Sequence, residues 1–433
     1  MKKIFLLIAG LVIFSELTKA QEVLRLPDAV NIALKNSLDI QLAQNRIAGD
    51  SILNNIGVAG GLPLVTGNIA DNEQISSVNQ KLNTGTNIQR NNAAANALTA
   101  GVTGSILLYN GGRVIATKKR LGQLEMQSRQ LLTSQIQNIL ADVMIGYYDV
   151  VRQQNYIKTI GRSIDASNQQ LQIVKVRQSV GLANNADLFQ AQIDLSNLQQ
   201  AKLAQQLVID QAKTELLRLL TVNPDSSISI QDTIIVDKDV LLETVMNGLS
   251  KNADVIAADD QIRINELIVK ETDALRYPSI RATTGYNFVR NKTAAGNILL
   301  NQNYGPTVGV SIGIPIYNGS VYRRQKQVAQ INVQNADLQK QIVIRDYSAN
   351  AVKQYQAYSN TINQLDSAVA AYSIADRLLQ LTLFRFQLRQ ATIVEVRDAQ
   401  QSFEESGFRL VNLNFAAKSA EIELKRLANT LTL

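Results

Sequence analysis

Apolar and polar residues alternate along three segments of the chain. In "NYGPTVGVSIGIPIYN" (303–318) the even positions are almost all apolar, and the odd positions are mostly Gly, Thr or Ser. The segments "NALTAGVTGSILLYN" (96–110) and "YPSIRATTGYNFVRN" (277–291) repeat this period, and the segment near 63–76 shows it weakly. A period of two predicts β-strands, two over about 62–109 and two over about 278–317. The pattern fits lipid-facing barrel strands and also half-buried strands of a soluble sheet.

Two long segments lack the residues that end helices. Val321–Leu388 contains neither Gly nor Pro, and its 68 residues would form a helix about 100 Å long. Arg113–Val180 is interrupted only by Gly122, Gly146 and Gly161. No globular core is wide enough for such helices, so we predict two rods that pack along one another. The alternative is that each rod consists of two or three shorter helices.

The two halves of the chain follow one plan. Tyr-Asn-Gly occurs at 109–111 and again 208 residues later, and "ELLRL" (215–219) is related to "ELKRL" (423–427) by the same offset. Ordered matches at a constant offset predict an internal two-fold repeat. We expect a turn-rich linker between the copies to add a short strand. The expected domains are a signal peptide (1–20), repeat 1 (21–222, with long helices over 111–221), the linker (223–239) and repeat 2 (240–433, with long helices over 319–430).

The composition excludes most catalytic chemistry. The chain has no Cys, His or Trp, which rules out thiolate and imidazole catalysis, disulfides and histidine-ligated metals. No GxxxxGK[ST] motif is present, and the strand glycines fit sheet positions better than a phosphate cradle. We therefore predict no catalytic residues, no cofactor, no metal and no enzyme activity.

The first twenty residues have the pattern of a secretory signal. Lys2 and Lys3 precede the apolar run Ile4–Phe14, and small or polar residues lead to Ala20, which predicts cleavage before Gln21. A single transmembrane anchor is the alternative, but the run is shorter than the ~20 residues a span needs. No Cys follows the cleavage point, so we expect no lipid anchor. Any membrane contact must then come from strands or an amphipathic surface.

Four strands per chain leave two open edges. In hydrocarbon each unpaired backbone group costs several kcal/mol, so strands placed in lipid must close with further copies. Two chains would give eight strands around a filled interior, whereas three give twelve strands around a water-filled lumen. Because the inner residues are small, we predict a mixed α/β membrane protein: a trimeric 12-stranded β-barrel continued by a long α-helical barrel.

The repeated Tyr-Asn-Gly motif is predicted to mark the point where a strand leaves the bilayer. The tyrosines would lie at the interface, and Asn-Gly permits the positive φ that redirects the backbone. These residues are Tyr109, Asn110, Gly111, Tyr317, Asn318 and Gly319. We expect the cations that follow to meet lipid phosphates and the polar face of the helical barrel: Arg113, Lys118, Lys119, Arg120, Arg323, Arg324 and Lys326. We predict no nucleic-acid binding, because the clusters are short and lack interleaved aromatic residues.

Over residues 22–433 the chain resembles the TolC-like outer-membrane factor family. The resemblance rests on the repeated plan, the Tyr-Asn-Gly motifs and the segments "VGLANNADLFQAQ" (180–192) and "LRQATIVEVRDAQQ" (388–401). It implies a homotrimer in the outer membrane of a Gram-negative bacterium that extends into the periplasm. Such a trimer is the passive exit duct of a tripartite efflux pump or type I secretion system. Its partners would be outer-membrane lipid, a periplasmic adaptor (membrane fusion) protein and an inner-membrane transporter of RND or ABC type; substrate and transporter class stay open.

The resemblance also assigns roles to two helical turns. Residues at the tips would contact the adaptor: Val180, Gly181, Leu182, Leu388, Arg389 and Gln390. Acids matching the family's entrance motifs are Asp187, Glu395 and Asp398, which threefold symmetry would turn into rings that select cations. Helix capping is the alternative for two of them, because Asn184 with Asp187 and Thr392 with Glu395 have capping-box spacing.

Two departures leave the closed state of the entrance open. Phe386 and Ala391 stand where well-studied members of the family carry a Tyr and an Arg, and Arg389 or Arg397 are candidate substitutes. The rival functions are a secreted coiled-coil structural or adhesion protein and, more remotely, a carboxylate-based hydrolase. The hydrolase is disfavoured because no compact domain is available to build a dry pocket.

Overall fold

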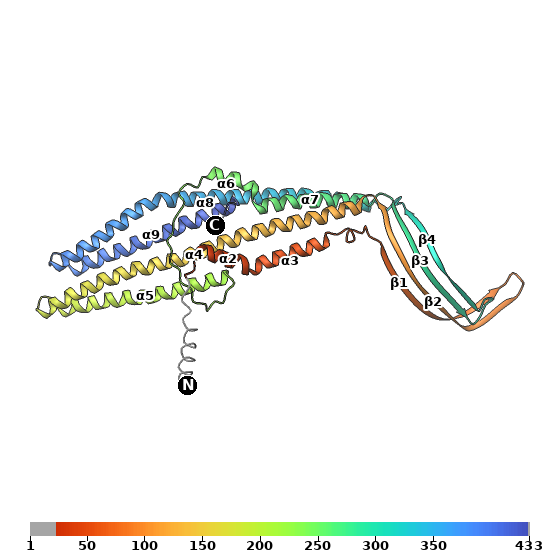
Figure 1. The fold of residues 1–433 in the computed structure, drawn as a ribbon, viewed down its shortest axis with the longest axis horizontal. Helices are drawn as coiled ribbons and strands as arrows, with labels where there is room; N and C mark the ends of the chain where they lie inside the picture. The colour runs from red at the N-terminus through yellow and green to blue at the C-terminus, as the bar shows by residue number, and fades with distance from the viewer. Residues whose placement is uncertain (1–22, 432–433) are drawn as a thin grey trace, which may run out of the picture. The chain divides into compact units, whose positions relative to one another are not determined.

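The computed structural model describes residues 23–431, so the predicted signal peptide lies outside the described residues. Within this range the chain passes twice through helices, a pair of strands and two long helices (Figure 1). The elements are α2 (Leu26–Asn36), α3 (Leu38–Leu53), β1 (Leu64–Lys81), β2 (Asn87–Asn110), α4 (Arg113–Ser179), α5 (Asn185–Leu219), α6 (Leu242–Gly248), η1 (Leu249–Lys251), α7 (Ala253–Ala274), β3 (Ser279–Thr293), β4 (Leu300–Gly313), α8 (Val321–Gln387) and α9 (Ile393–Leu427).

Contacts divide the chain into two compact units, which are described separately. The sheet unit comprises Asn45–Arg129 and Ala257–Gln341 and includes the four strands. The helical unit comprises the chain up to Gln44, Gln130–Ile256 and the chain from Ile342 onwards. Helices α3, α4, α7 and α8 contribute residues to both units.

The two long rods are single helices. α4 and α8 have 67 residues each, and α5 and α9 have 35 each. The bounds of α8 and α9 are those of α4 and α5 shifted by 208 residues. The predicted rods are therefore confirmed, and the alternative of shorter helices is wrong. Inside α4, Gly146 lies against α5, where an added Cβ would be 3.0 Å from Leu219 Cδ1. The equal bounds support the duplication, which stays a prediction.

The apolar core of the helical unit lies between the helices in three clusters. One joins α2 to the middle of α4, with Val30 and Tyr147 buried among its members. A second, near the helical turns, packs Phe386 of α8 against Phe403 of α9 and the end of α4. The third packs α6 against α8 and α9. The core thus holds the α4–α5 hairpin against the α8–α9 hairpin. Among the described residues, no helix is both long enough and apolar enough to cross a membrane.

The linker 223–239 does not form the short strand that we expected. Its pairing within the described range is a single parallel bridge between Val23 and Ser229. It is held instead by isolated contacts: Ile230 is buried in the core cluster of α2 and α4, and the Asp237 amide donates to the carboxylate of buried Glu421 at 2.9 Å. The turn-forming residues of this segment favour such point contacts over a continuous ladder.

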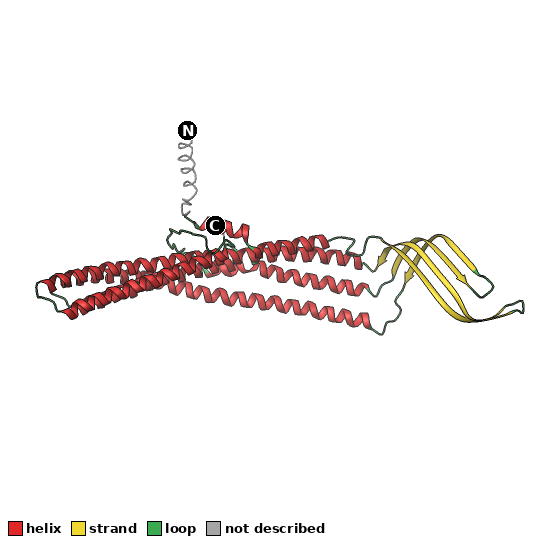
Figure 2. Cartoon of the chain, turned by 90° about the horizontal axis from the view of Figure 1, so that it is seen from below, coloured by secondary structure: helices red, strands yellow, loops and turns green. Residues whose placement is uncertain are grey.

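The four strands form one antiparallel sheet in the order β1-β2-β3-β4. Figure 2 shows the strands side by side, in yellow. The weakly patterned first segment is a strand, as predicted. The fourth strand ends at Gly313, so its predicted extension to Tyr317 is wrong. The reason is that Gly313 already pairs with Ser279, the first residue of β3, and Pro315 has no N–H to donate.

Candidate functional site

The strand register gives the sheet one apolar face and one polar face. Three rows of paired residues on the apolar face are Val65–Gly104–Thr284–Val308, Gly67–Val102–Tyr286–Pro306 and Ile69–Ala100–Phe288–Tyr304. The alternate rows contain small and polar residues, as in Thr66–Thr103–Gly285–Thr307 and Asn68–Gly101–Asn287–Gly305. The register therefore aligns the predicted alternation across all four strands, with apolar residues on one face and small or polar residues on the other.

The apolar face is a band of defined height. On β3 it runs from Ile280 to Phe288, which is about 27 Å at ~3.4 Å per residue. The apolar band of a transmembrane barrel is ~25 Å tall and has aromatic residues at both edges. A register shift between Leu107 and Tyr109 places Tyr109 opposite Ile280 at one edge, and Phe288 pairs with Tyr304 at the other. The height and the aromatic edges both match those of a membrane-spanning sheet.

Charged side chains begin one row beyond the aromatic edge. Asp71 and Arg290 occupy the next row, and Glu73 and Lys292 the row after it. The Asn96 Nδ2 group donates to Asp71 at 2.6 Å and to Glu73 at 2.7 Å. These charges mark where the apolar band ends, because ionised groups are costly to place in hydrocarbon.

Nothing in the described part of the chain covers the apolar face. Ile69 is 80% exposed and Val308 is 86% exposed. Soluble monomers rarely leave a contiguous apolar surface of this extent open. The sheet therefore requires lipid or further protein against this face.

The two Tyr-Asn-Gly motifs redirect the backbone where we expected, through their glycines. Gly111 has φ +69° and Gly319 has φ +67°. At Gly111 an added Cβ would lie 2.7 Å from the Ala274 carbonyl oxygen, so only glycine fits. The Asn110 side chain accepts from the Val114 amide at 3.3 Å and so caps the start of α4. Tyr317 lies outside β4, which ends at Gly313.

Part of the cation clusters binds groups of the same chain. Arg120 forms an ion pair with Glu271 at 2.7 Å, and Lys326 forms one with Asp273 at 3.0 Å. Lys118 donates to the side chain of Asn54. These three cations therefore contact polar groups of α7 and of the residue that follows α3, which agrees with one part of the expectation. Contact of the clusters with lipid phosphates stays a prediction.

The turn between α4 and α5 ends its helix with a glycine. Gly181 has φ +75°, and the Leu182 amide donates to the Arg177 carbonyl at 2.7 Å. This six-to-one bond is typical of a Schellman helix end. Val180 and Leu182 are more than half exposed, at 62% and 52%, so the turn presents two apolar side chains outward.

The turn between α8 and α9 has the same backbone with a different residue. Arg389 has φ +63° at the position equivalent to Gly181, and the Gln390 amide donates to the Arg385 carbonyl at 2.8 Å. The Arg385 guanidinium also donates to the Gln390 carbonyl at 2.8 Å. Leu388 is 51% exposed. Both predicted tips are therefore accessible turns with an outward apolar residue.

Two of the three predicted entrance acids are part of capping boxes. Asn184 accepts from the Asp187 amide at 2.8 Å, and Thr392 accepts from the Glu395 amide at 3.2 Å. Each acid accepts in return from the cap residue's amide. The backbone hydrogen bond from Thr392, with its side-chain bond, lowers the pKa of Glu395. The capping alternative is thus correct as a structural role for both acids.

Asp398 differs from these two acids. It lies on the exposed face of α9, one turn beyond Glu395, and within the described chain its carboxylate makes no hydrogen bond or ion pair. Because the Asp398 carboxylate has no partner in the described chain, it is available to bind ions or to contact another subunit.

A residue that we did not predict links the two turns. The Arg177 guanidinium stacks on the buried ring of Phe386, 4.3 Å from its centroid, and donates to the Phe386 carbonyl. Burial and the nearby guanidinium of Arg389 lower the pKa of Arg177. Neither Arg389 nor Arg397 has a side-chain partner in the described residues, so next to the turns the polar contact between the hairpins comes from Arg177, and further along α4 Arg162 forms an ion pair with Asp376 of α8. Sequence could show only that Arg177 and Arg385 are equivalent positions.

Comparison with known proteins identifies the family. A family model described as "Outer membrane efflux protein" matches residues 29–222 and 247–430. The chain belongs to the outer membrane efflux protein family. The family resemblance inferred from the sequence is therefore confirmed, and the two matched segments of this efflux protein contain most of the described helices and strands.

Relatives and solved structures agree with this assignment. The efflux protein is 24% identical over 373 residues to "Outer membrane protein TolC" of Vibrio cholerae, covering 81% of this chain and 82% of the relative. It superposes on VceC of V. cholerae with a TM-score of 0.74 at 19% identity, covering 93% and 96% of the two chains. For the CmeC outer membrane channel of Campylobacter jejuni, the TM-score is 0.76 at 15% identity, covering 94% and 85%. The structural likenesses show that the fold is shared.

Proposed function

We propose that this protein is the passive outer-membrane exit duct of a tripartite efflux pump or type I secretion system, built as a homotrimer in a Gram-negative bacterium. In this proposal it has no catalytic activity of its own. A periplasmic adaptor and an inner-membrane transporter of RND or ABC type open it and supply the energy. Membership of the outer membrane efflux protein family supports the location and the channel role.

The observation that supports a duct most strongly is an apolar band on a sheet with two open edges. Within residues 23–431, β1 and β4 each have one side without a partner strand. Backbone groups cannot stay unpaired in hydrocarbon, so further copies must supply the missing partners. Three copies give a closed barrel of twelve strands, and the rows of Gly, Thr, Ser and Asn then line a lumen wide enough for water. The band would face outer-membrane lipid.

The helical unit supports the same assembly. Apolar side chains that no described residue covers lie on α5 and on α8. They are Phe189, Ile193, Leu203 and Leu207 on α5, and Ile374, Leu378, Leu381 and Phe384 on α8. Exposed apolar rows at near-helical spacing favour helix-to-helix packing against a neighbour. In the trimer we expect α5 of one copy to pack against α8 of the next.

The helical turns are the proposed contacts with the adaptor. Their outward side chains are uncharged or apolar at four positions and cationic at Arg389, which suits docking to another protein. The same end of the protein is the proposed entrance. There Asp398 is the leading candidate for a cation-selecting ring, and Asp187 and Glu395 add charge while capping their helices.

Single-channel recording tests this function. Purified protein added to a planar lipid bilayer should give discrete, cation-selective currents. Asp398→Asn should shift the reversal potential in a salt gradient toward lower cation selectivity. Asp225→Asn makes the same charge change in the exposed linker and should leave the selectivity unchanged. A protein that stays water-soluble without detergent and gives no current would instead be the secreted coiled-coil scaffold.

A further inference from the structure

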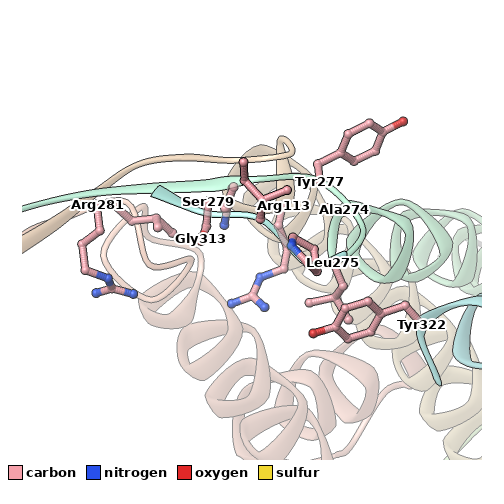
Figure 3. Close-up of a pocket in the computed structure, with 12 residues that line it drawn as sticks. Arg113, Ala274, Leu275, Tyr277, Ser279, Arg281, Gly313 and Tyr322 are labelled. Carbon is pink, nitrogen blue, oxygen red and sulfur yellow. The ribbon is translucent and has the colours of Figure 1, made fainter. Parts of the chain in front are cut away.

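A cavity of about 460 Å³ lies where the polar face of the sheet meets the long helices (Figure 3). Small-molecule sites in proteins have volumes of ~300–1,000 Å³. Leu107 and Arg281 form one row of the polar face, and Ser279 and Gly313 pair in the row next to it. All four residues line the cavity, together with Arg113 at the start of α4. The whole cavity is built from the sheet unit.

Two unpaired guanidinium groups dominate the electrostatics of this cavity. Arg113 and Arg281 both line it and, within the described chain, their guanidinium groups have neither a carboxylate partner nor a hydrogen-bond partner. This distinguishes them from neighbouring cations, because Arg276 and Lys326 share Asp273 and Arg120 pairs with Glu271. None of the residues that line the cavity is acidic. The cavity therefore has positive charge that the protein does not neutralise.

Further donors point to an anion. The Asn110 Oδ1 atom is engaged by the Val114 amide, and its Nδ2 atom is buried without a hydrogen-bond partner. A buried amide donor without a partner is uncommon in folded proteins. Asn110 lines the cavity at the start of α4, where the helix dipole adds partial positive charge. Tyr322 also lines it, and its hydroxyl can donate (Figure 3).

Part of the wall is apolar. Leu107, Leu275, Ile314 and Pro315 line the cavity together with the ring of Tyr322. An inorganic ion would leave this surface without a partner. A ligand with an anionic head and a small apolar or aromatic body would use both the arginines and the apolar wall. A guanidinium group can donate two hydrogen bonds to the oxygens of a phosphate or sulfonate group. The apolar body would cover the apolar wall and so remove it from water.

We infer that this cavity binds small amphipathic organic anions, with a phosphate or sulfonate group held by Arg113 and Arg281 and an aromatic or aliphatic body against the apolar wall. The inference rests on the proposed function for its location: the polar face lines the lumen only if the trimer is a duct. In that case each trimer has three such sites at the junction of barrel and helices. The duct then has both an acidic entrance and basic sites, and anionic molecules are among its cargo.

Calorimetric titration of the purified protein, in an uncharged detergent, with 1-naphthyl phosphate tests the inference. We expect saturable binding of one molecule per chain, weakened at least about tenfold when Arg113→Gln and Arg281→Gln are combined. Arg324→Gln removes an exposed cation of α8 that does not line the cavity and should leave binding unchanged. 1-Naphthylmethylammonium, with the same ring and opposite charge, should not bind.

The inference is overturned if wild-type protein does not bind the phosphate, if the cationic ring compound binds equally well, or if the double variant binds like wild type. Should the double variant fail to fold, the wild-type salt dependence decides. Binding through two guanidinium groups weakens as salt rises, whereas partition into detergent does not. Currents in a bilayer without anion binding would refute this inference alone. Anion binding without any current would refute the proposed duct and leave the cavity's ligand class standing.

Discussion

The α4–α5 and α8–α9 turns have the same backbone and are held by different side chains. Each has a residue with positive φ, at Gly181 and at Arg389, followed by an amide that bonds back to an arginine carbonyl. At the first turn the arginine, Arg177, reaches across to Phe386 on the other hairpin. At the second, Arg385 bonds to the Gln390 carbonyl of its own turn. The comparison shows that equivalent positions keep backbone geometry while side chains take separate roles.

The difference also has an energetic cost. Glycine adopts positive φ freely, whereas a residue with a Cβ pays about 1 kcal/mol or more. The second turn contains this strain at Arg389 and is stabilised by the burial of Phe386, which is 3% exposed. The first turn has Gln178 at the position equivalent to Phe386, and the Gln178 side chain donates to Asn185 Oδ1 at 2.6 Å. The second turn should therefore depend more on its buried side chain.

The largest expected effect follows from Phe386→Ala. Removing a buried aromatic ring and the surface on which Arg177 stacks should lower the free energy of local opening by about 3 kcal/mol. Hydrogen–deuterium exchange of the last turns of α8 measures this loss. Phe384→Ala removes a ring that is 57% exposed, two residues earlier, and should change exchange far less. Equal effects of the two variants would contradict the asymmetry.

Exchanging the residues with positive φ should have opposite effects at the two turns. Arg389→Gly should stabilise its turn by about 1 kcal/mol, because the backbone strain is removed. Gly181→Ala should destabilise the other turn by about the same amount. The same exchange measurement follows both. Arg389→Ala serves as the control, since it removes the charge and keeps the backbone strain. If Arg389→Ala stabilises the turn as much as Arg389→Gly does, the loss of the charge explains the stabilisation and the strain does not.

The two capping boxes should contribute similarly. Thr392→Ala and Asn184→Ala each remove the side chain that accepts from the third residue of its helix, and each should cost about 1 kcal/mol. Thr392→Ser keeps the hydroxyl and should behave nearly as wild type. Hydrogen–deuterium exchange of the first-turn amides of α9 and α5 measures this cost. If the exchange rate is unchanged in both alanine variants, the caps do not stabilise the helix ends.

The smallest expected effect is a pH dependence at the second turn. Because the cap lowers the pKa of Glu395, its contribution is complete above the ordinary carboxyl pKa of about 4.3 and is lost as pH falls through the lowered value. First-turn amides of α9, corrected for intrinsic exchange, should lose protection in acid. Glu395→Gln does not titrate and should flatten this dependence. If the protection of these amides in the wild-type protein does not change in acid, the Glu395 carboxylate does not contribute to the cap.

Local sequence patterns predicted the helices and strands better than they predicted the tertiary contacts. The absence of Gly and Pro located α8 to within one residue of its observed end, and the spacing Thr-x-x-Glu identified a capping box. The strand end at Gly313 was missed because alternation continues through Ile316, although β3 offers no partner beyond Ser279.

Features that depend on residues far apart in sequence could not be predicted. Arg177 and Phe386 are 209 residues apart, and Arg113 and Arg281 meet at one cavity only because the register of β2 and β3 brings them together. No local period contains such information. The acids of the helical turns were found by family resemblance, and only the structure separated the capping pair from the uncommitted Asp398.

The central claim is that two further copies of the chain close the open edges of the sheet. The molar mass of the detergent-solubilised mature protein, measured by light scattering with the detergent contribution subtracted, tests it most directly. The account predicts a particle of three chains that does not dissociate on dilution in detergent. A mass of one chain, with the apolar band of β4 still uncovered, would contradict it.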